Sequence, residues 1–255
     1  MNFRKAIYFS ILFIGIFSGR GYGQKKTNYI PPEGNGFTVL ELFTSEGCSS
    51  CPAADRALVQ LGEEYKHDFY VMEFHVDYWN YLGWKDKFSS KLYTDRQSHY
   101  AFLFMLSDTY TPQVIINGTK ELSGSDKAKI RPFINRNMLK EPTASLKISA
   151  TAHINKVFVA YSNVNTQGQL LNVALVQKKA MTNVRYGENK GRKLTHTNIV
   201  RDFKTIDIIE DHGFVEVYLP LGIVAEECSV IAYTQKKDSW KVTSGAACAI
   251  SVENH

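Results

Sequence analysis

The sequence lacks a second long hydrophobic run, and it lacks a cysteine at the end of the run that it has. Arg4 and Lys5 precede an apolar run over residues 6–17, and small and polar residues follow. This pattern predicts a secretory signal peptide over residues 1–23. The run is shorter than the roughly 20 apolar residues of a membrane span, so a retained anchor is the less favoured alternative. We therefore predict a periplasmic or secreted protein without a lipid anchor on this segment and with no membrane contact after cleavage.

Charge of one sign is also in short supply. The chain has 30 Lys and Arg residues against 25 Asp and Glu residues. Three of the basic residues fall in the signal segment and none of the acidic ones does, so the remainder carries a net charge near +2. Acidic and basic residues are interspersed along the chain. The composition therefore gives no reason to expect nucleic acid or acidic lipid as a partner.

The pattern of the sequence changes near residues 141–143, and this predicts two domains. Residues 24–36 form an extended leader, residues 37–142 alternate apolar runs with helix-like stretches, and residues 143–255 contain short β-rich runs separated by turns. The later part predicts a small β-sandwich with a polar, solvated connection over 187–196. Its predicted strands are 156–162, 170–177, 214–219 and 229–235.

The first domain begins with a predicted strand, helix and strand. Residues 37–45 and 69–76 are the strands, and apolar residues recur between them at helical spacing. Such a unit makes a parallel pair with a right-handed crossover. An Asn-Gly pair at residues 117–118 predicts a hairpin, and a closing helix follows near residue 130. Cys48 and Cys51 then lie where the first strand turns into its helix, which is a usual site position on such a sheet.

The spacing of Cys48 and Cys51 suits a dithiol that opens and closes with little backbone movement. Residues three apart in a first helical turn lie about 5–6 Å from each other, within the reach of a disulfide. Free N–H groups at the helix start favour the thiolate. Pro52 makes a helix start at Pro52 with Cys51 as its cap, which weakens that field at Cys48. A working dithiol, a pair of metal ligands and a static clamp all stay open.

Several motifs resemble known proteins. The segments ELFTSEGCSSCP and FHVDYW and the Thr111-Pro112 pair resemble thioredoxin-like proteins over residues 37–140. The longer motifs ELFTSEGCSSCPAAD, HVDYWNYLGWKD, YTPQVIING and GENKGRKLTHTNIVR are similar to an uncharacterised family of secreted bacterial proteins, over nearly the whole chain. The first resemblance implies an α/β thioredoxin-like domain ahead of the all-β sandwich-like one. The second implies no established activity.

The thioredoxin resemblance also implies roles for single residues. Cys48 would attack a disulfide and Cys51 would resolve the mixed disulfide, with thiols or disulfides of exported proteins as partners. Thr111 would offer backbone hydrogen bonds to a substrate, and the Thr111-Pro112 bond is expected to be cis. Glu41 resembles a buried acid that moves protons, although its different spacing favours a surface or salt-bridged position.

His75 and Asp77 support a metal-binding alternative, since residues two apart on a strand share one face. Together with Cys48 and Cys51, His75 would supply the thiolates and imidazole with which some periplasmic copper chaperones hold Cu(I). Those proteins space their cysteines differently. We therefore expect no cofactor and keep copper as the alternative. Zinc is disfavoured because a fourth ligand is missing.

Two further features complete the sequence predictions. The aromatic residues around Trp79 predict a hydrophobic cluster that holds residues 77–88 against the sheet, with the wall of a ligand groove as the alternative. Cys228 and Cys248 lie equally far from Asp238, the centre of an expected hairpin turn. They would face each other across the strands, which predicts a structural disulfide worth about 2–4 kcal/mol. A bulge would shift the register and leave both thiols free.

Overall fold

The computed structural model describes residues 34–138, 140 and 145–252. The predicted signal peptide, most of the leader and the expected boundary at 141–143 lie outside these residues. The helices are α1 (Cys51–Tyr65), α2 (Lys91–Leu103) and α3 (Lys127–Met138), with short 3-10 turns η1 (Asn80–Leu82) and η2 (Ala225–Glu227). The strands are β1 (Thr38–Thr44), β2 (Phe69–His75), β3 (Gln113–Ile116), β4 (Lys120–Ser123), β5 (Lys147–His153), β6 (Lys156–Ser162), β7 (Gln169–Asn183), β8 (Lys193–Asp207), β9 (His212–Tyr218), β10 (Cys228–Lys236) and β11 (Val242–Val252).

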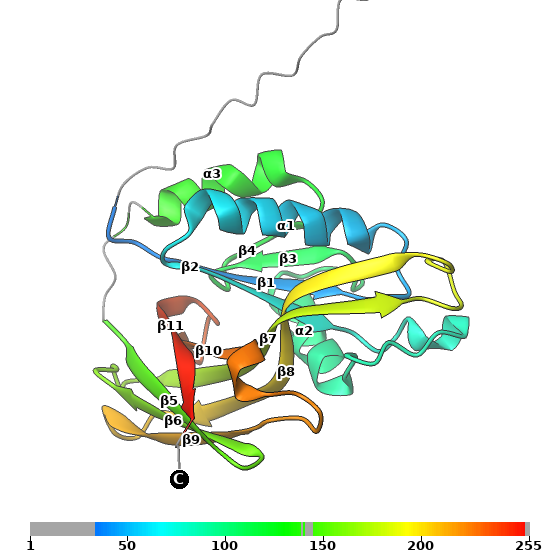
Figure 1. Ribbon diagram of the computed structural model, residues 1–255. Helices are drawn as coiled ribbons and strands as arrows, with labels where there is room; N and C mark the ends of the chain where they lie inside the picture. Colours follow the sequence, from blue (N-terminus) through cyan, green and yellow to red (C-terminus); the bar gives the residue numbers. More distant parts are fainter. Residues whose placement is uncertain (1–33, 139, 141–144, 253–255) are drawn as a thin grey trace, which may run out of the picture.

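These strands form one mixed sheet in the order β4-β3-β1-β2-β8-β7-β10-β11-β5-β6-β9 (Figure 1). The predicted fold class, an α/β thioredoxin-like domain followed by a separate all-β sandwich, is therefore wrong. The correction comes from β8, which pairs in parallel with β2 through Glu73 and Ile199 and so joins the two halves in one sheet. The β-rich character predicted for residues 143–255 is confirmed. Hydrophobic patterns identify strands, but they do not identify the strand's neighbour.

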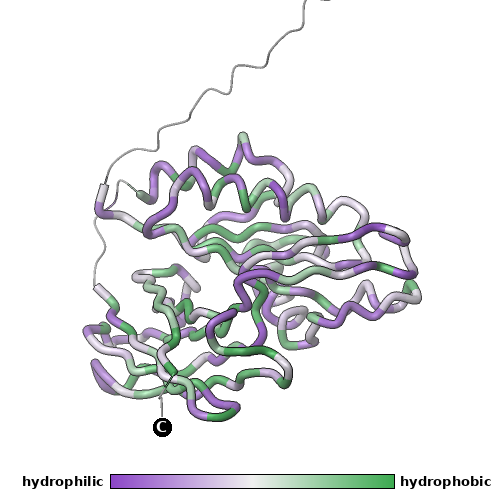
Figure 2. The backbone as a smooth tube through the Cα atoms, viewed as in Figure 1, coloured by the Kyte–Doolittle hydropathy of each residue, from purple (hydrophilic) through white to green (hydrophobic). Residues whose placement is uncertain are grey.

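The local units predicted for the first half are present. β1 and β2 are parallel and are connected through α1, and β3 and β4 form a hairpin whose turn contains Asn117 and Gly118, both with positive φ. The Thr111-Pro112 bond is cis, as predicted. The helical stripe of α1 is buried, and in Figure 2 the hydrophobic colour follows the central strands that α1 covers. The stripe consists of Ala54, Leu58, Leu61 and Tyr65.

The two faces of β1 belong to different cores. Leu40 and Leu42 pack with residues of α1 and α3, whereas Val39 and Phe43 pack with residues of α2, β7 and β10. This follows from the alternation of side chains along a strand. A third core lies in the second half, where the sheet curls over so that β7 and β10 pack against β6 and β9 (Figure 1). No helix of the described chain is long and apolar enough to cross a membrane.

The predicted disulfide between Cys228 and Cys248 is wrong, because both cysteines are free. A register shift between Thr234 and Gln235 places Cys248 opposite Val230 instead of opposite Cys228. This is the bulge that would leave both thiols unpaired. Burial raises the pKa of each thiol to about 11, so both stay protonated at neutral pH.

Candidate functional site

Cys48 and Cys51 form a disulfide at the junction of β1 and α1, with their Cα atoms 5.4 Å apart. The helix begins at Cys51, one residue earlier than predicted, and Ser50 caps it without a side-chain hydrogen bond. The turn is closed by backbone bonds: Cys48 N donates to Ser45 O and Cys51 N donates to Cys48 O. The sequence therefore places the pair as expected, and the short spacing accounts for the bond.

Both cysteines are buried, at 1% exposure for Cys48 and 0% for Cys51. Such burial is typical of an inert cysteine, whereas reactive thiols are partly exposed. Neighbouring Ser49 and Ser50, in contrast, are exposed. The disulfide is thus closed off in this structure, and a partner could reach it only after something moves.

Residues 184–192, which connect β7 and β8 and which we call the cover loop, close one side of the disulfide turn. Asn189 Nδ2 donates to the carbonyl oxygens of Glu46 (2.9 Å) and Cys48 (2.8 Å), and Asn189 is fully buried. Ser49 N donates to the Glu188 carboxylate at 3.0 Å. The prediction of a solvated turn over 187–196 is therefore wrong for this part. The polar composition of the loop matches its partners, which are backbone groups of the turn.

Trp79 closes another side of the turn. A Cβ atom on Gly47 would lie only 3.0 Å from the Trp79 Cβ, so the two residues are in close contact. Trp79 Nε1 donates to Thr111 Oγ1 at 2.8 Å. Thr111, predicted to bind substrate, is thereby connected to the disulfide turn. Pro112 is buried and packs near α1, since a Cβ on Gly124 would lie within 3.2 Å of both Pro112 and Ala54.

Glu41 lies on the other face of the sheet. Its carboxylate accepts two hydrogen bonds from Arg96 of α2, at 2.6 and 2.9 Å, and one from Tyr100 at 2.7 Å. Tyr233 of β10 accepts a further bond from Arg96 at 2.8 Å. Glu41 is thus a buried, salt-bridged residue, as the spacing argument favoured, and it belongs to the junction of the two halves instead of the disulfide site.

His75 and Asp77 do not act on one face. β2 ends at His75, and Asp77 Oδ1 instead accepts a hydrogen bond from Thr94 of α2 at 2.6 Å. The expected shared face would require the strand to continue for two more residues. His75 points to the side where α1 lies, and its Nδ1 contacts Asp86 Oδ2 at 2.7 Å.

A cluster of buried acidic residues and histidines lies next to the disulfide. His75 Nε2 and His196 Nδ1 both face Glu73 Oε2, at 3.8 and 3.6 Å, and His196 Nδ1 also faces Asp55 Oδ2 at 3.5 Å. Glu46 Oε1 lies 3.6 Å from the other nitrogen of His196. Glu46 directly precedes the cysteine turn, and Asp55 follows Cys51 by one helical turn. We call Glu46, Asp55, Glu73, His75, Asp86 and His196 the acid-histidine cluster.

The pKa values of this cluster reflect burial opposed by close charges. Burial alone lowers the pKa of a histidine, but Asp86 and Glu73 outweigh it at His75 and raise that pKa to about 9. At His196, burial is outweighed by Asp55, Glu46 and Glu73, which raise the pKa to about 12. Burial and Glu73 raise the pKa of Asp55 to about 6. Burial also acts on Glu73, but the two histidines lower its pKa below the usual value.

Sequence analysis assigned a role to only one member of this cluster, His75. Glu73 carried a usable signal, because a charged residue inside a hydrophobic strand is almost never buried without a partner. His196 gave no comparable signal, since its approach to His75 depends on the pairing of β8 with β2. The aromatic connection serves both expected purposes in part: Phe88 is buried beside His75, and Trp84 Nε1 donates to Glu46 Oε2 at 2.7 Å.

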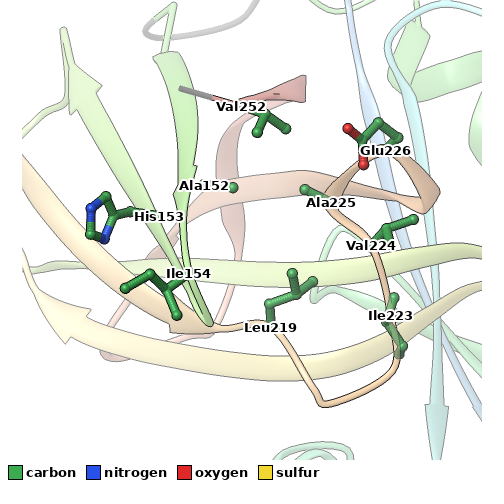
Figure 3. A pocket seen from close by; sticks show the side chains of 9 residues that line it. All are labelled: Ala152, His153, Ile154, Leu219, Ile223, Val224, Ala225, Glu226 and Val252. Carbon is green, nitrogen blue, oxygen red and sulfur yellow. The ribbon is translucent and has the colours of Figure 1, made fainter. Parts of the chain in front are cut away.

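A second hollow lies in the other half of the sheet. Figure 3 shows its lining, which comes from the end of β5, from residues 219–226 and from Val252. Its volume is about 310 Å³, and its lining side chains are mostly aliphatic. It contains neither of the disulfide cysteines and no member of the acid-histidine cluster. The chemistry-bearing groups are therefore gathered at the junction of β1 and α1.

The fold and site together define a class of protein: one mixed sheet that carries a buried disulfide and an acid-histidine cluster where β1, β2 and β8 meet α1. The chain belongs to the family described as protein of unknown function (DUF1223), whose model matches residues 39–235. This agrees with the predicted resemblance to an uncharacterised family. No curated protein matches the chain.

Two solved structures are similar over most of the chain. Protein AGR_C_4864 from Agrobacterium tumefaciens is 27% identical, with a TM-score of 0.62 over 88% of this chain and 99% of that one. HBP35 of Porphyromonas gingivalis is 15% identical, with a TM-score of 0.57 over 86% of this chain and 76% of that one. The second likeness concerns the fold alone. Both matches extend through the two halves, in agreement with one continuous sheet.

Proposed function

We propose that the protein is an exported thiol-disulfide redox protein whose Cys48–Cys51 pair reacts with other exported proteins when the cover loop moves aside. In the reducing direction, the Cys48 thiolate attacks a sulfur of the partner's disulfide and releases a partner thiolate. The Cys51 thiolate then attacks Cys48 of the mixed disulfide and releases the second partner thiolate. Two electrons pass to the partner, and the reverse sequence oxidises a partner dithiol. Export rests on the predicted signal peptide.

The observation that supports this proposal is the nature of the cover. The hydrogen bonds from the loop to the turn come from two side chains, Asn189 and Glu188, and each such bond contributes only about 0.5–1.5 kcal/mol net. Local opening of such a surface connection costs far less than unfolding the sheet. The position of Cys51 at the start of α1 then favours the thiolate once the pair is reduced.

Replacing Asn189 tests the proposed opening. In Asn189→Ala, both hydrogen bonds to the turn are lost, and we expect the disulfide to be reduced by a small phosphine about ten times faster. A loss of about 1.4 kcal/mol in the closed state changes the opening equilibrium tenfold. The measurement is the rate of thiol release under a fixed excess of reductant. Asn165→Ala is the control, because Asn165 Oδ1 bonds only the nearby Gln167 N in an exposed loop.

The reduction potential decides whether the pair can exchange at all. We expect a value within the range of about −120 to −270 mV that exchange proteins occupy. A potential below about −300 mV, together with an unchanged reduction rate in Asn189→Ala, would instead identify a static clamp and end the proposal.

The copper alternative finds no support in the geometry. His75 directs one nitrogen to Asp86 and the other toward Glu73, so its surroundings are carboxylates and not sulfur. Cu(I) prefers thiolates, whereas oxygen and nitrogen ligands suit harder divalent ions. We do not propose copper at Cys48, Cys51 and His75.

A further inference from the structure

We propose that Glu73, His75, His196 and Asp55 form a buried site for a divalent first-row transition-metal ion, with Zn²⁺ the ion that fits this ligand set best. Within the described part of the chain, Glu73, His75 and His196 are all buried and each offers a ligand atom within 4.8 Å of the others. Asp55 adds a fourth, since its Oδ2 lies 3.5 Å from His196 Nδ1. The site is separate from the redox proposal and does not use the cysteines.

The carboxylate ligands each have one oxygen held from outside and one directed inward. Glu73 Oε1 accepts hydrogen bonds from the backbone and side chain of Thr197, whereas Glu73 Oε2 is buried without a hydrogen-bond partner. Asp55 Oδ1 accepts a bond from Thr44 Oγ1, and Asp55 Oδ2 faces His196. The outer bonds fix the orientation of each carboxylate, as outer partners do in known metal sites.

The histidines follow the same arrangement. His75 Nδ1 donates to Asp86 Oδ2 at 2.7 Å, which leaves its Nε2 free of hydrogen bonds. His196 turns Nε2 toward Glu46 Oε1 and Nδ1 toward Glu73 and Asp55, again without a hydrogen bond at either nitrogen. A carboxylate behind a histidine selects the tautomer whose lone pair points to the ion. Buried polar atoms are rarely left without a partner, so this convergence requires an explanation.

The distances between the inward atoms match the edges of a coordination shell. Atoms bound at about 2.0–2.2 Å to a tetrahedral ion lie roughly 3.3–3.6 Å apart. The measured separations are 3.5 Å for Asp55 to His196, 3.6 Å for Glu73 to His196 and 3.8 Å for Glu73 to His75. A set of direct ion pairs would instead close to hydrogen-bond distance, as His75 and Asp86 do at 2.7 Å.

The charges of the cluster also favour a cation. Four buried carboxylates surround two imidazoles, so when ionised the cluster keeps a negative excess even with both histidines protonated. Uncompensated charge in a buried position is costly, and a dication would balance it. The carboxylates are Glu46, Asp55, Glu73 and Asp86.

A surface pocket gives the ion a route of entry. The pocket has a volume of about 240 Å³ and is lined by Asp55, Pro52, Arg56 and residues 193–195. Asp55 therefore separates the pocket from the buried ligands. His196 follows the lining residue Thr195 directly, so two of the four ligands come from the segments that form the pocket.

Metal binding to the full chain after the predicted signal cleavage tests this proposal. The oxidised protein is stripped with a chelator and titrated with Zn²⁺ against a chromogenic competitor, and bound metal is counted by elemental analysis. We expect one equivalent per chain and an increase in Tm on loading. Glu73→Gln and Asp55→Asn, which keep side-chain size, should lower the affinity at least tenfold. His212→Gln is the control, because His212 is exposed and pairs only with the adjacent Asp211 in the second half.

X-ray absorption of the loaded unmodified protein gives a measurement that does not depend on the folding of variants. We expect a first shell of nitrogen and oxygen with imidazole scattering and no sulfur. A first shell with sulfur, the absence of stoichiometric binding, or unchanged affinity in both variants would each overturn the proposal. Because the disulfide stays closed throughout, failure here leaves the redox proposal intact, and failure of the redox tests leaves this one intact.

Discussion

Replacing Glu41 by Gln should lower the free energy of unfolding by about 3–5 kcal/mol. Glu41 and Arg96 are both buried, and removing one partner of such a pair leaves an uncompensated charge in the interior. The Arg96 guanidinium would keep its bonds to Tyr100 and Tyr233, but neither phenol carries a compensating charge at neutral pH. Urea unfolding followed by tryptophan fluorescence and by circular dichroism measures the loss.

Asp95→Asn provides the matched control on the same helix. Asp95 pairs with Lys91 at 2.6 Å, but both side chains are more than half exposed. Exposed pairs contribute little, so we expect almost no change in the urea midpoint. Equal effects of Glu41→Gln and Asp95→Asn would contradict the importance assigned to burial.

The Glu41 prediction also concerns how the two halves unfold. Arg96 of α2 binds β1 through Glu41 and β10 through Tyr233, so one guanidinium spans the two halves. Gln235 of β10 adds a bond to Tyr100 at 2.9 Å. We therefore expect the two spectroscopic signals to change together in the unmodified protein.

Local structure could be predicted from the sequence more fully than the fold. The β1-α1-β2 unit, the hairpin at Asn117 and Gly118 and the cis bond before Pro112 depend on neighbouring residues and on short crossovers. The pairing of β2 with β8 joins Glu73 to Ile199, far apart in the chain, and no local pattern encodes it. The same limit explains Cys228 and Cys248, whose register depends on a single bulge in β10.

The site divides in the same way. Cys48 and Cys51 could be found because three-residue spacing is a local property, and their bond follows from it. Their burial could not be found, because Asn189 reaches the turn from a connection about 140 residues later. His196 is brought beside His75, at 4.8 Å between ring centres, by the same long-range pairing. The sequence thus contains the reactive groups, while the fold decides which of them meet.

Replacing Gly118 by Ala should destabilise the protein by about 2–4 kcal/mol, through the contact between the β3-β4 turn and the β10-β11 turn. Gly118 has φ +65°, and a Cβ there would lie 1.8 Å from the carbonyl oxygen of Trp240. That oxygen accepts a bond from Gln235, and Val242 N donates to Asn117 O at 3.0 Å, so the two turns are held by backbone groups that cannot easily withdraw. Thermal and urea unfolding measure the loss.

Gly168→Ala separates the close approach from the backbone strain. Gly168 has a similar φ of +60°, but a Cβ there would meet nothing within 4 Å. Both variants incur the cost of a left-handed alanine, about 1 kcal/mol, and only Gly118→Ala adds the clash between the halves. A destabilisation of Gly118→Ala no larger than that of Gly168→Ala would mean that the two turns do not pack as closely in solution, and the junction between the halves would then depend on β2, β8 and Arg96 alone.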